Sequence, residues 1–249
     1  MEDYKELIRR AEDLARRCER SGSVTHSAFL TPAESFELQN WARQHREIRV
    51  LFHGGAADCE RRAAFFLPDW LEEDYFSPEE YIAAIRLTAY FGSPGHRDYM
   101  GALLGMGIGR EWLGDIRVIE NVAYVFCMPS VQKHLLGIDK VGRYTVTAEE
   151  IAQADVPAME RKVREKRFSV QSLRLDAVLG GLFDLSRSEA ARQIEAGLVS
   201  VNYRECLKCD LSIMEGDILA LRGKGKGSVR EIGGISRKGR LFVKGEVLQ

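Results

Sequence analysis

Hydrophobic positions in the first part of the chain follow two spacings, one typical of helices and one typical of strands. Apolar side chains recur every three or four positions in residues 3–20, which predicts an amphipathic helix. The segment TPAE, residues 31–34, has a cap, a proline at the first helical position and a glutamate at the third, so a second helix is predicted to begin there. We expect that helix to end near Arg46, before buried strands at 48–52 and 63–67.

The middle of the chain shows a regular succession of strands and helices. Its periodicity predicts strand, helix, strand, strand, helix and strand, which is the order of a ferredoxin-like sandwich. The first segment also has helical spacing in "EEYIAAIRL", so both interpretations of it stay open. RNA-recognition motifs (RRMs) share this layout, but the third strand, "NVAYVFCM", lacks their aromatic stacking signature, so topology alone does not establish RNA binding. The predicted segments are 81–91, 97–106, 115–119, 121–128, 130–136 and 143–147.

A helix start and a strand follow each other closely in "LSRSEAARQIEAGLVSVN", residues 185–202. Ser186 and Glu189 form the pattern of a capping box, and Gly197 lies where the end of a helix favours a positive φ angle. The residues after Gly197 alternate like a short strand. The sequence therefore predicts a small capped helix that leads directly into a strand.

The segments on either side add a second helix, another strand and a basic loop. Leucines and a valine in residues 173–182 lie on one helical face, while Arg174 and Asp176 project elsewhere. A strand is predicted at 218–221, directly before "RGKGKG", residues 222–227. We expect this last segment to be a flexible loop whose cations are spaced for successive phosphates. Two small helices on a few strands, with such a loop, suit recognition of an RNA backbone.

Together these patterns predict an α+β protein with several domains. The charge-rich run "ERKVREKR", which follows Pro157, has the composition of a linker before the last domain. We therefore divide the chain into an N-terminal helical and α/β region, 1–75, a central ferredoxin-like or RRM-like βαββαβ domain, 76–150, a charged linker, 151–167, and a small C-terminal α+β domain, 168–249.

The composition is that of an ordinary soluble globular protein, with 45% hydrophobic and 29% charged residues. The N-terminus has no apolar stretch of the kind found in secretory signals, and no apolar run is long enough to cross a bilayer. The five cysteines are scattered, which fits a reducing compartment. We expect a cytoplasmic protein that is monomeric in solution and does not associate with membranes.

Charge is distributed unequally along the chain, although the net charge is only −1. From residue 157 onward there are 18 Lys and Arg against 12 Asp and Glu, whereas residues 1–156 hold 18 against 25. A basic C-terminal part joined to an acidic N-terminal part indicates an anionic partner for one end only. A solvated charged face is the alternative explanation.

Motifs for cofactors, metals and catalysis are weak in this chain. The glycine-rich segment 101–114 matches neither the dinucleotide-binding pattern nor a phosphate-binding loop. Cys206 and Cys209 form a lone Cys-x-x-Cys, whereas a structural zinc site needs four ligands. No catalytic triad can be assembled with any specificity. We therefore predict a protein that is not an enzyme and that needs no cofactor and no metal.

The C-terminal motifs resemble the RNA-binding domain named after small-subunit ribosomal protein S-four. The resemblance rests on "LRLDAVL", "LSRSEAARQIEAGLVSVN" and "MEGDILALRGKG" in that order, and it covers about residues 172–228. Tyr203 departs from the pattern, because such domains usually place glycine after the asparagine. This departure concerns the geometry of the turn.

The rest of the chain resembles the bacterial YlmH proteins and their photosynthetic relatives, the photosystem II proteins with an S-four domain. The segments "FLTPAE", "HGGAADCERR", "GHRDYMGALLGMGIGREWLGDI" and "VGRYTV" carry this resemblance. It implies a ribosome-associated protein that engages rRNA and tRNA on the large subunit carrying peptidyl-tRNA, during ribosome-associated quality control. Two other functions stay open: an RNA-modifying enzyme of the pseudouridine synthase or methyltransferase type, and an RNA-binding scaffold whose N-terminal part binds protein.

The candidate RNA-binding residues lie mainly in the C-terminal domain. Arg187 leaves the first turn of the predicted helix, where free backbone N–H groups also favour phosphate. A weak surface ion pair with a nearby carboxylate is the alternative role for Arg187. We expect Arg174, Arg187, Lys224 and Lys226 to line one groove. A possible secondary contact with RNA or the ribosome is predicted at His96, Arg97 and Arg110. The full C-terminal set is Arg174, Asp176, Ser186, Arg187, Ser188, Arg192, Asn202, Lys208, Arg222, Lys224, Lys226 and Arg230.

Overall fold

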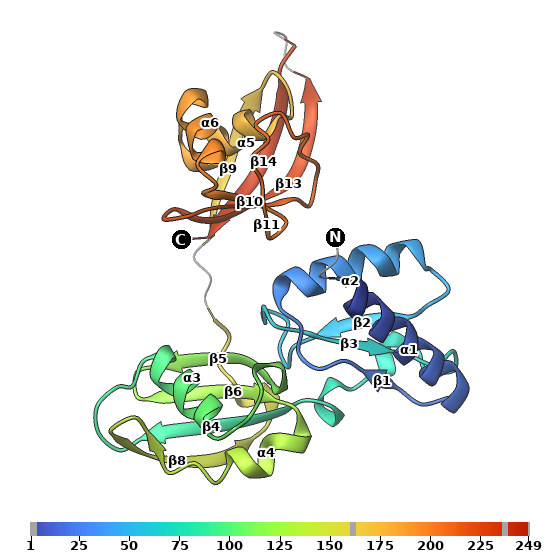
Figure 1. Ribbon diagram of the computed structural model, residues 1–249, viewed down its shortest axis with the longest axis vertical. Coiled ribbons are helices and arrows are strands. Elements are labelled where there is room, and N and C mark those ends of the chain that lie inside the picture. The colour runs from blue at the N-terminus through green and yellow to red at the C-terminus, as the bar shows by residue number, and fades with distance from the viewer. Residues whose placement is uncertain (1–3, 160–162, 236–238, 249) are drawn as a thin grey trace. The chain divides into compact units, whose positions relative to one another are not determined.

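The structure is a computed structural model that describes residues 4–159, 163–235 and 239–248. The chain divides into two units, Met1–Met159 and Glu160–Gln249 (Figure 1). Both units combine helices with antiparallel sheets, so the predicted α+β class is confirmed. Within the described ranges, no helix combines the length and the apolar character that crossing a bilayer requires.

The N-terminal region packs two helices on a three-stranded antiparallel sheet of order β1-β3-β2. Its elements are α1 (Lys5–Ser21), β1 (Thr25–His26), α2 (Pro32–Gln44), β2 (Val50–His53) and β3 (Ala63–Phe66). The predicted start of α2 is confirmed, because the Glu34 backbone N–H donates to the Thr31 hydroxyl at 3.2 Å and the Glu34 carboxylate accepts from the Thr31 N–H at 2.7 Å. These two bonds satisfy backbone donors that the helix itself leaves without partners.

Strand β3 is buried on both faces, because each face packs on a different layer. Ala64 and Phe66 point toward α1 and α2, where they join a cluster that includes Leu38. Ala63 and Phe65 point the opposite way, into a cluster that contains residues of the middle sheet. The regions 1–75 and 76–150 therefore share a hydrophobic core within the first unit.

The middle of the chain forms the predicted succession of strands and helices, and its ambiguous first segment is a strand. The sheet is antiparallel with the order β5-β6-β4-β8-β7, and its first four strands have the order of a ferredoxin-like sandwich. The elements are β4 (Ala83–Ala89), α3 (His96–Gly105), β5 (Leu113–Ile119), β6 (Val122–Cys127), α4 (Pro129–Leu135), β7 (Lys140–Val141) and β8 (Tyr144–Ile151). Short 3₁₀ helices occur at Glu73–Tyr75, Pro78–Glu80, Arg110–Trp112 and Gln153–Asp155.

The two faces of this middle sheet are covered by different parts of the first unit. On one face Ile85 packs with Leu103 of α3 and Leu135 of α4. On the other face Phe126 of β6, which is completely buried, packs with Phe65 of β3. In RNA-recognition motifs a sheet face carries the aromatic side chains that stack on bases. Here the N-terminal region covers the face that lies opposite α3 and α4.

A buried arginine fixes the end of this unit to the N-terminal region. Arg117 of β5, whose side chain is 1% exposed, pairs with Asp58 at 2.6 Å and donates to the Pro157 carbonyl at 2.7 Å. Its guanidinium lies 5.3 Å from the centroid of the Phe126 ring. The Asp58 carboxylate also accepts from the Met159 backbone N–H at 2.9 Å. The chain up to Met159 therefore belongs to the first unit.

The structure differs from the predicted charged linker, 151–167, at both of its ends. Ile151 ends β8, and Val156 is buried in the core that both sheets of the first unit share. At the other end, β9 (Val163–Val170) is the edge strand of the sheet in the second unit. Charged residues are common on edge strands, where their side chains reach solvent, so a charge-rich sequence is compatible with a strand here. Residues 160–162 of the predicted linker lie outside the described residues.

The second unit is a six-stranded antiparallel sheet of order β11-β10-β12-β13-β14-β9, with two helices against one face (Figure 1). Its elements after β9 are α5 (Leu175–Phe183), α6 (Arg187–Glu195), β10 (Val199–Val201), β11 (Arg204–Glu205), β12 (Ile218–Leu221), β13 (Gly225–Ile235) and β14 (Leu241–Leu248). The predicted helices and the strands at 199–201 and 218–221 are confirmed.

The core of this unit lies between α5, α6 and one face of the sheet. Leu182 of α5 and Ile194 of α6 pack with Val243 of β14 in one cluster. The helix approaches β14 so closely that a Cβ added to Gly245 would lie 2.4 Å from Leu182 Cδ2. Because side chains alternate between the faces of a strand, Phe242 and Lys244 point to the face opposite the helices.

The flexible basic loop predicted at 222–227 is instead a tight hairpin turn. Leu221 of β12 pairs with Gly225 of β13, so only residues 222–224 form the turn. Gly223 has a φ of 84°, a backbone conformation that glycine adopts without steric cost. The prediction is wrong for the rest of the segment because residues from Gly225 onward hydrogen-bond with β12.

Candidate nucleic-acid interface

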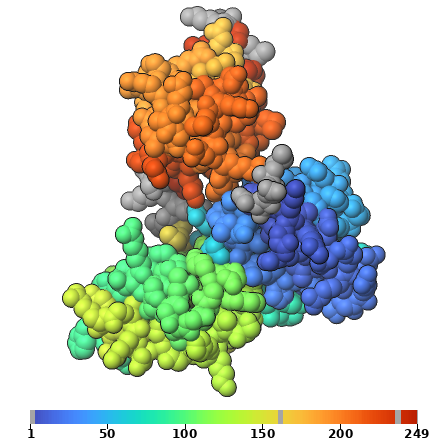
Figure 2. Space-filling view, in the orientation of Figure 1, coloured from blue at the N-terminus to red at the C-terminus, as the bar shows by residue number. Residues whose placement is uncertain are grey.

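The start of α6 belongs to the region coloured orange in Figure 2, and its first residue is an exposed arginine. The predicted capping box is confirmed: the Glu189 N–H donates to the Ser186 hydroxyl at 3.2 Å, and the Ser186 N–H donates to the Glu189 carboxylate at 2.9 Å. The Ser186 hydroxyl is therefore engaged in the cap and positions the residue that follows it. That residue, Arg187, lies in the first turn of α6 and its side chain is 61% exposed.

A buried carboxylate connects Arg187 to a second arginine. Asp176 in the first turn of α5 has a side chain that is only 6% exposed. Its oxygens accept from Arg174 Nε and Nη2 at 3.3 and 3.2 Å, and from Arg187 Nε at 3.1 Å. Burial opposes ionisation of Asp176, but the hydrogen bonds and charges of the two arginines outweigh it and lower the pKa of the carboxyl group. Asp176 is thus ionised at neutral pH and holds both guanidinium groups in place.

This arrangement changes the interpretation of two predicted residues. Asp176 is predicted as an RNA-binding residue that projects away from the core, but it is buried, so it acts by positioning the two arginines. Arg187 does form an ion pair, as the alternative interpretation proposes, but its partner is buried and shared with Arg174. Arg187 bonds to Asp176 through Nε, and its Nη nitrogens make no hydrogen bond to the described residues. Those nitrogens are available to an anion.

A cavity of about 380 Å³ adjoins the arginine pair (its lining includes Ser172, Asp176, Arg187 and Arg240). Arg240 precedes β14 and donates a hydrogen bond to the Ser169 carbonyl. Arg240 is thus a further cation at this site that is absent from the predicted set. The basic run "RKGR" that ends at Arg240 is the signal in the sequence that points to it.

Lys224 lies at the corner between α5 and α6, near the start of α6. Its ammonium group is 3.4 Å from the Phe183 carbonyl. The hydrogen bond from Lys166 lowers the pKa of Asp184, the hydrogen bond from Ser186 lowers the pKa of Glu189, and the charge of Lys224 acts in the same direction on both. The carbonyl groups at the C-terminal end of a helix attract a cation. The hairpin turn therefore places Lys224 on the helix side of the unit.

Lys226 does not line the same groove, which corrects the prediction. Gly227 faces Leu182 of α5, so the alternation along β13 directs Lys226 to the face opposite the helices. There its ammonium group lies 5.5 Å from the centroid of the Tyr203 ring. The cations that were expected to line one groove therefore lie on two different faces of the sheet.

Asn202 stabilises the β10–β11 turn, which corrects its prediction as an RNA contact. Its amide donates to Asp217 at 2.8 Å, and its carbonyl oxygen accepts from the Ile218 N–H at 2.9 Å. Asn202 and Tyr203 have φ angles of 50° and 67°, as a two-residue type I′ turn requires. Tyr203 thus adopts a conformation that glycine would adopt without steric cost.

The remaining predicted residues of the second unit are dispersed. Arg230 pairs with Glu246 at 2.6 Å through neighbouring strands, so its charge is offset locally. The Ser188 hydroxyl is 3.2 Å from that of Ser186. The side chains of four predicted residues are exposed on α6, the loop before β12 and the hairpin turn: Ser188, Arg192, Lys208 and Arg222.

Of the three residues predicted to form a secondary contact in the first unit, two are exposed. His96 and Arg97 are exposed in the first turn of α3. Arg110, by contrast, is half-buried and donates to the carbonyls of Leu113 and Gly114 at 2.6 and 3.0 Å. Burial lowers the pKa of Arg110 to about 10, with the nearby Arg61 acting in the same direction. Arg110 therefore stabilises the turn before β5 and is not a surface contact.

Two aromatic side chains in front of α3 are absent from the predicted set. Tyr90 and Phe91, directly after β4, are 60% and 84% exposed. Large apolar side chains in such positions often mark contact surfaces. Arg143 lies near these two residues. The Tyr144 ring contacts Gly92, which follows Phe91, and the Arg143 guanidinium lies 5.2 Å from the centroid of the Tyr144 ring. The sequence signal for this exposed aromatic pair is "YF" between a predicted strand and the proline and glycine that follow.

Comparisons with known proteins agree with an RNA-related function. A model of the family described as the putative RNA-binding domain in YlmH matches residues 72–155. The chain is 29% identical over 218 residues to the ribosome-associated protein quality control protein P2 of Bacillus subtilis (strain 168). The matched region covers 86% of this chain and 84% of that protein. The structure is similar to that of the cell division protein ylmH from Streptococcus pneumoniae, with a TM-score of 0.52 and 19% identity over 60% of this chain and 91% of that one. At that identity the structural similarity concerns the fold alone. The family model and the Bacillus subtilis relative support an RNA-binding role.

Proposed function

Given its resemblance to YlmH proteins, which these comparisons confirm, we propose that the chain is an RNA-binding factor of ribosome-associated quality control. In this proposal it engages rRNA and tRNA on the large ribosomal subunit that carries peptidyl-tRNA, and it acts by binding and not by catalysis. The name of the Bacillus subtilis relative supports the process, and the matched family model supports RNA as the ligand. We also propose that it acts as a monomer.

The observation that carries the proposal is the pair of arginines held by Asp176. Arg174 and Arg187 are 40% and 61% exposed, so their charges face solvent, whereas the carboxylate between them is buried. A guanidinium group whose orientation is fixed loses less entropy when it binds a phosphate, and its parallel N–H groups match phosphate oxygens. The free N–H groups and the dipole of α6 favour an anion at the same place.

The first unit contributes a second contact in this proposal. The face of its middle sheet that lies opposite α3 and α4 is covered, so RNA or a ribosomal protein would be met by the exposed group in front of α3. This group comprises Tyr90, Phe91, His96 and Arg97. Its aromatic side chains supply stacking surface and its arginine supplies charge. The second unit then supplies most of the affinity for free RNA, while the first unit supports placement on the ribosome.

Titration of RNA at several salt concentrations tests the role of Arg187. Arg187→Ala should weaken binding of a tRNA and of an rRNA fragment about equally and lower the dependence of log affinity on log salt by about one charge. Arg9→Ala is a matched control, because Arg9 is an exposed arginine on α1 in the other unit. Equal affinities and equal salt dependence for wild type and Arg187→Ala would refute the proposed site.

A further inference from the structure

The sheet of the second unit has a face that points away from α5 and α6, and this face carries an exposed phenylalanine. Phe242 of β14 is 51% exposed, whereas its neighbour Val243 is buried on the helix side. Ser169 of β9 lies opposite Phe242, and Gly233 of β13 lies on its other side. Because neither neighbour has a bulky side chain, the faces of the Phe242 ring are accessible to another planar group.

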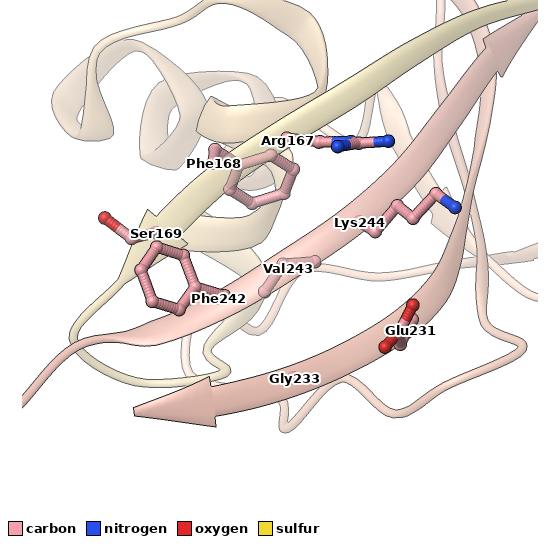
Figure 3. A pocket seen from close by; sticks show the side chains of 8 residues that line it. All are labelled: Arg167, Phe168, Ser169, Glu231, Gly233, Phe242, Val243 and Lys244. Carbon is pink, nitrogen blue, oxygen red and sulfur yellow. The ribbon is translucent and has the colours of Figure 1, made fainter. Parts of the chain in front are cut away.

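Two cations lie on the same face of the sheet, farther along the strands than the ring (Figure 3). Lys244 follows two residues after Phe242, about 7 Å along the strand. Its direct cross-strand partner is Arg167, and Figure 3 shows both side chains extending in the same direction from neighbouring strands. Like charges in directly opposite positions destabilise a sheet unless an anion offsets them. This juxtaposition therefore favours an anionic ligand.

The carboxylates nearby do not neutralise this pair. Arg167 reaches Glu165 only at 3.4 Å, and both side chains are more than half exposed, so this contact contributes little. Glu231 lies opposite Lys244 on β13, but Lys244 forms no ion pair with any residue that the structure describes. Arg167, Glu231 and Lys244 line a hollow of about 650 Å³ together with Phe242, and this volume is within the size range of small-ligand sites.

We infer that this face binds single-stranded RNA, with a base stacked on Phe242 and a phosphate of the same strand held by Arg167 and Lys244. The inference rests on the proposed RNA-binding function and adds to it a second site. The site lies on the opposite side of the sheet from the arginine pair of Arg174 and Arg187, so one unit would hold two RNA segments.

Substitutions at Phe242 in the full chain separate stacking from simple apolar contact. The probe is a uridine decamer, with an RNA hairpin without single-stranded overhangs for comparison. Phe242→Ala should weaken decamer binding about tenfold, as removal of a stacking side chain does, and leave hairpin binding unchanged. Phe242→Tyr should retain the affinity, whereas Phe242→Leu should lose it, because an aliphatic side chain offers no ring for stacking.

Charge and position provide two further comparisons. The double variant Arg167→Gln, Lys244→Gln should lower the dependence of log decamer affinity on log salt by about 1.4, because each phosphate contact on a single strand contributes about 0.7. Val163→Ala is the matched control, because Val163 lies at the other end of β9, on the same face, and is 45% exposed. Its decamer affinity should equal that of wild type.

The outcomes distinguish this site from the proposed function. If Phe242→Ala binds the decamer like wild type while Arg187→Ala weakens hairpin binding, the second site is wrong and the proposed function stands. If Phe242→Leu retains the decamer affinity, stacking on the ring does not account for the binding, and the proposed site would also be overturned. If wild type binds neither RNA, both proposals fail. Cross-links from 4-thiouridine in the decamer to the peptide that contains Phe242 would support the site directly.

Discussion

The middle sheet of the first unit and the sheet of the second unit differ in what covers their faces. Phe126 of the middle sheet lies on the face opposite α3 and α4, yet it is completely buried beneath the N-terminal region. Phe242 holds the corresponding position in the second unit, opposite α5 and α6, and it is 51% exposed. A sheet that resembles an RNA-recognition motif in topology has thus lost its open face, while the sheet of the small C-terminal unit keeps one. Access to a face, and not strand order, decides where a base can stack.

The largest expected effect tests whether the buried ion pair maintains the covering of the middle sheet. Asp58→Ala would leave the charge of Arg117 unpaired in the core, since the Arg117 side chain is 1% exposed. We expect the free energy of unfolding of the first unit to fall by roughly 3–5 kcal/mol. Urea denaturation followed by tryptophan fluorescence measures this change.

The double variant Asp58→Leu, Arg117→Met is the control for this prediction. Replacing both charges by apolar groups removes the pair without leaving a buried charge, so most of the lost stability should return. If Asp58→Ala alone costs less than about 1 kcal/mol, the pair behaves like an exposed one, and the covering of the sheet depends on hydrophobic packing only.

A smaller effect is expected at the carboxylate of the second unit. Asp176→Asn removes the charge that holds Arg174 and Arg187, and we expect it to cost about 1–2 kcal/mol at pH 7, because the amide still accepts one hydrogen bond. The pKa of Asp176 is lowered in the folded protein. Its stabilisation is therefore complete above its ordinary pKa of about 3.9 and is lost as the pH falls further, through the lower native pKa.

The measurement compares unfolding of wild type and Asp176→Asn at pH 7, 5 and 3. The difference in stability should be equal at the first two values and smaller at pH 3. Asp184→Asn is the matched control, because Asp184 caps the same helix and pairs with Lys166 but is 63% exposed. Its cost should stay below about 1 kcal/mol at every pH. A difference for Asp176→Asn that does not change between pH 7 and pH 3 would contradict the role of its ionised carboxylate.

The sequence predicts local elements of this molecule better than the surfaces that they form. The capping boxes at Thr31 and Ser186 are confirmed because they depend on residues only three positions apart. The strands β9 and β14 were not predicted, because charged and glycine residues interrupt their alternation, and their pairing joins residues far apart in the chain. The site shows the same contrast. The cap at Ser186 predicts the position of Arg187 in the first turn of α6, whereas the burial of Asp176 depends on packing between α5 and α6.

The smallest expected effect concerns the turn at the end of β10, next to Lys226. Tyr203 has a φ of 67°, a conformation that is costly for a residue with a Cβ and free of that cost for glycine. Both Tyr203→Gly and Tyr203→Ala remove the ring beside Lys226, so the comparison between them isolates the backbone. We expect the glycine variant to be more stable than the alanine variant by about 1 kcal/mol, measured by thermal unfolding.

The same pair of substitutions at Ser200, in the strand before the turn, is the control. There the alanine variant should be the more stable one, because glycine weakens the interior of a strand. If Tyr203→Ala and Tyr203→Gly were equally stable, the turn would have to relax when the ring is removed. The ring contact with Lys226 would then be what maintains the positive φ of Tyr203.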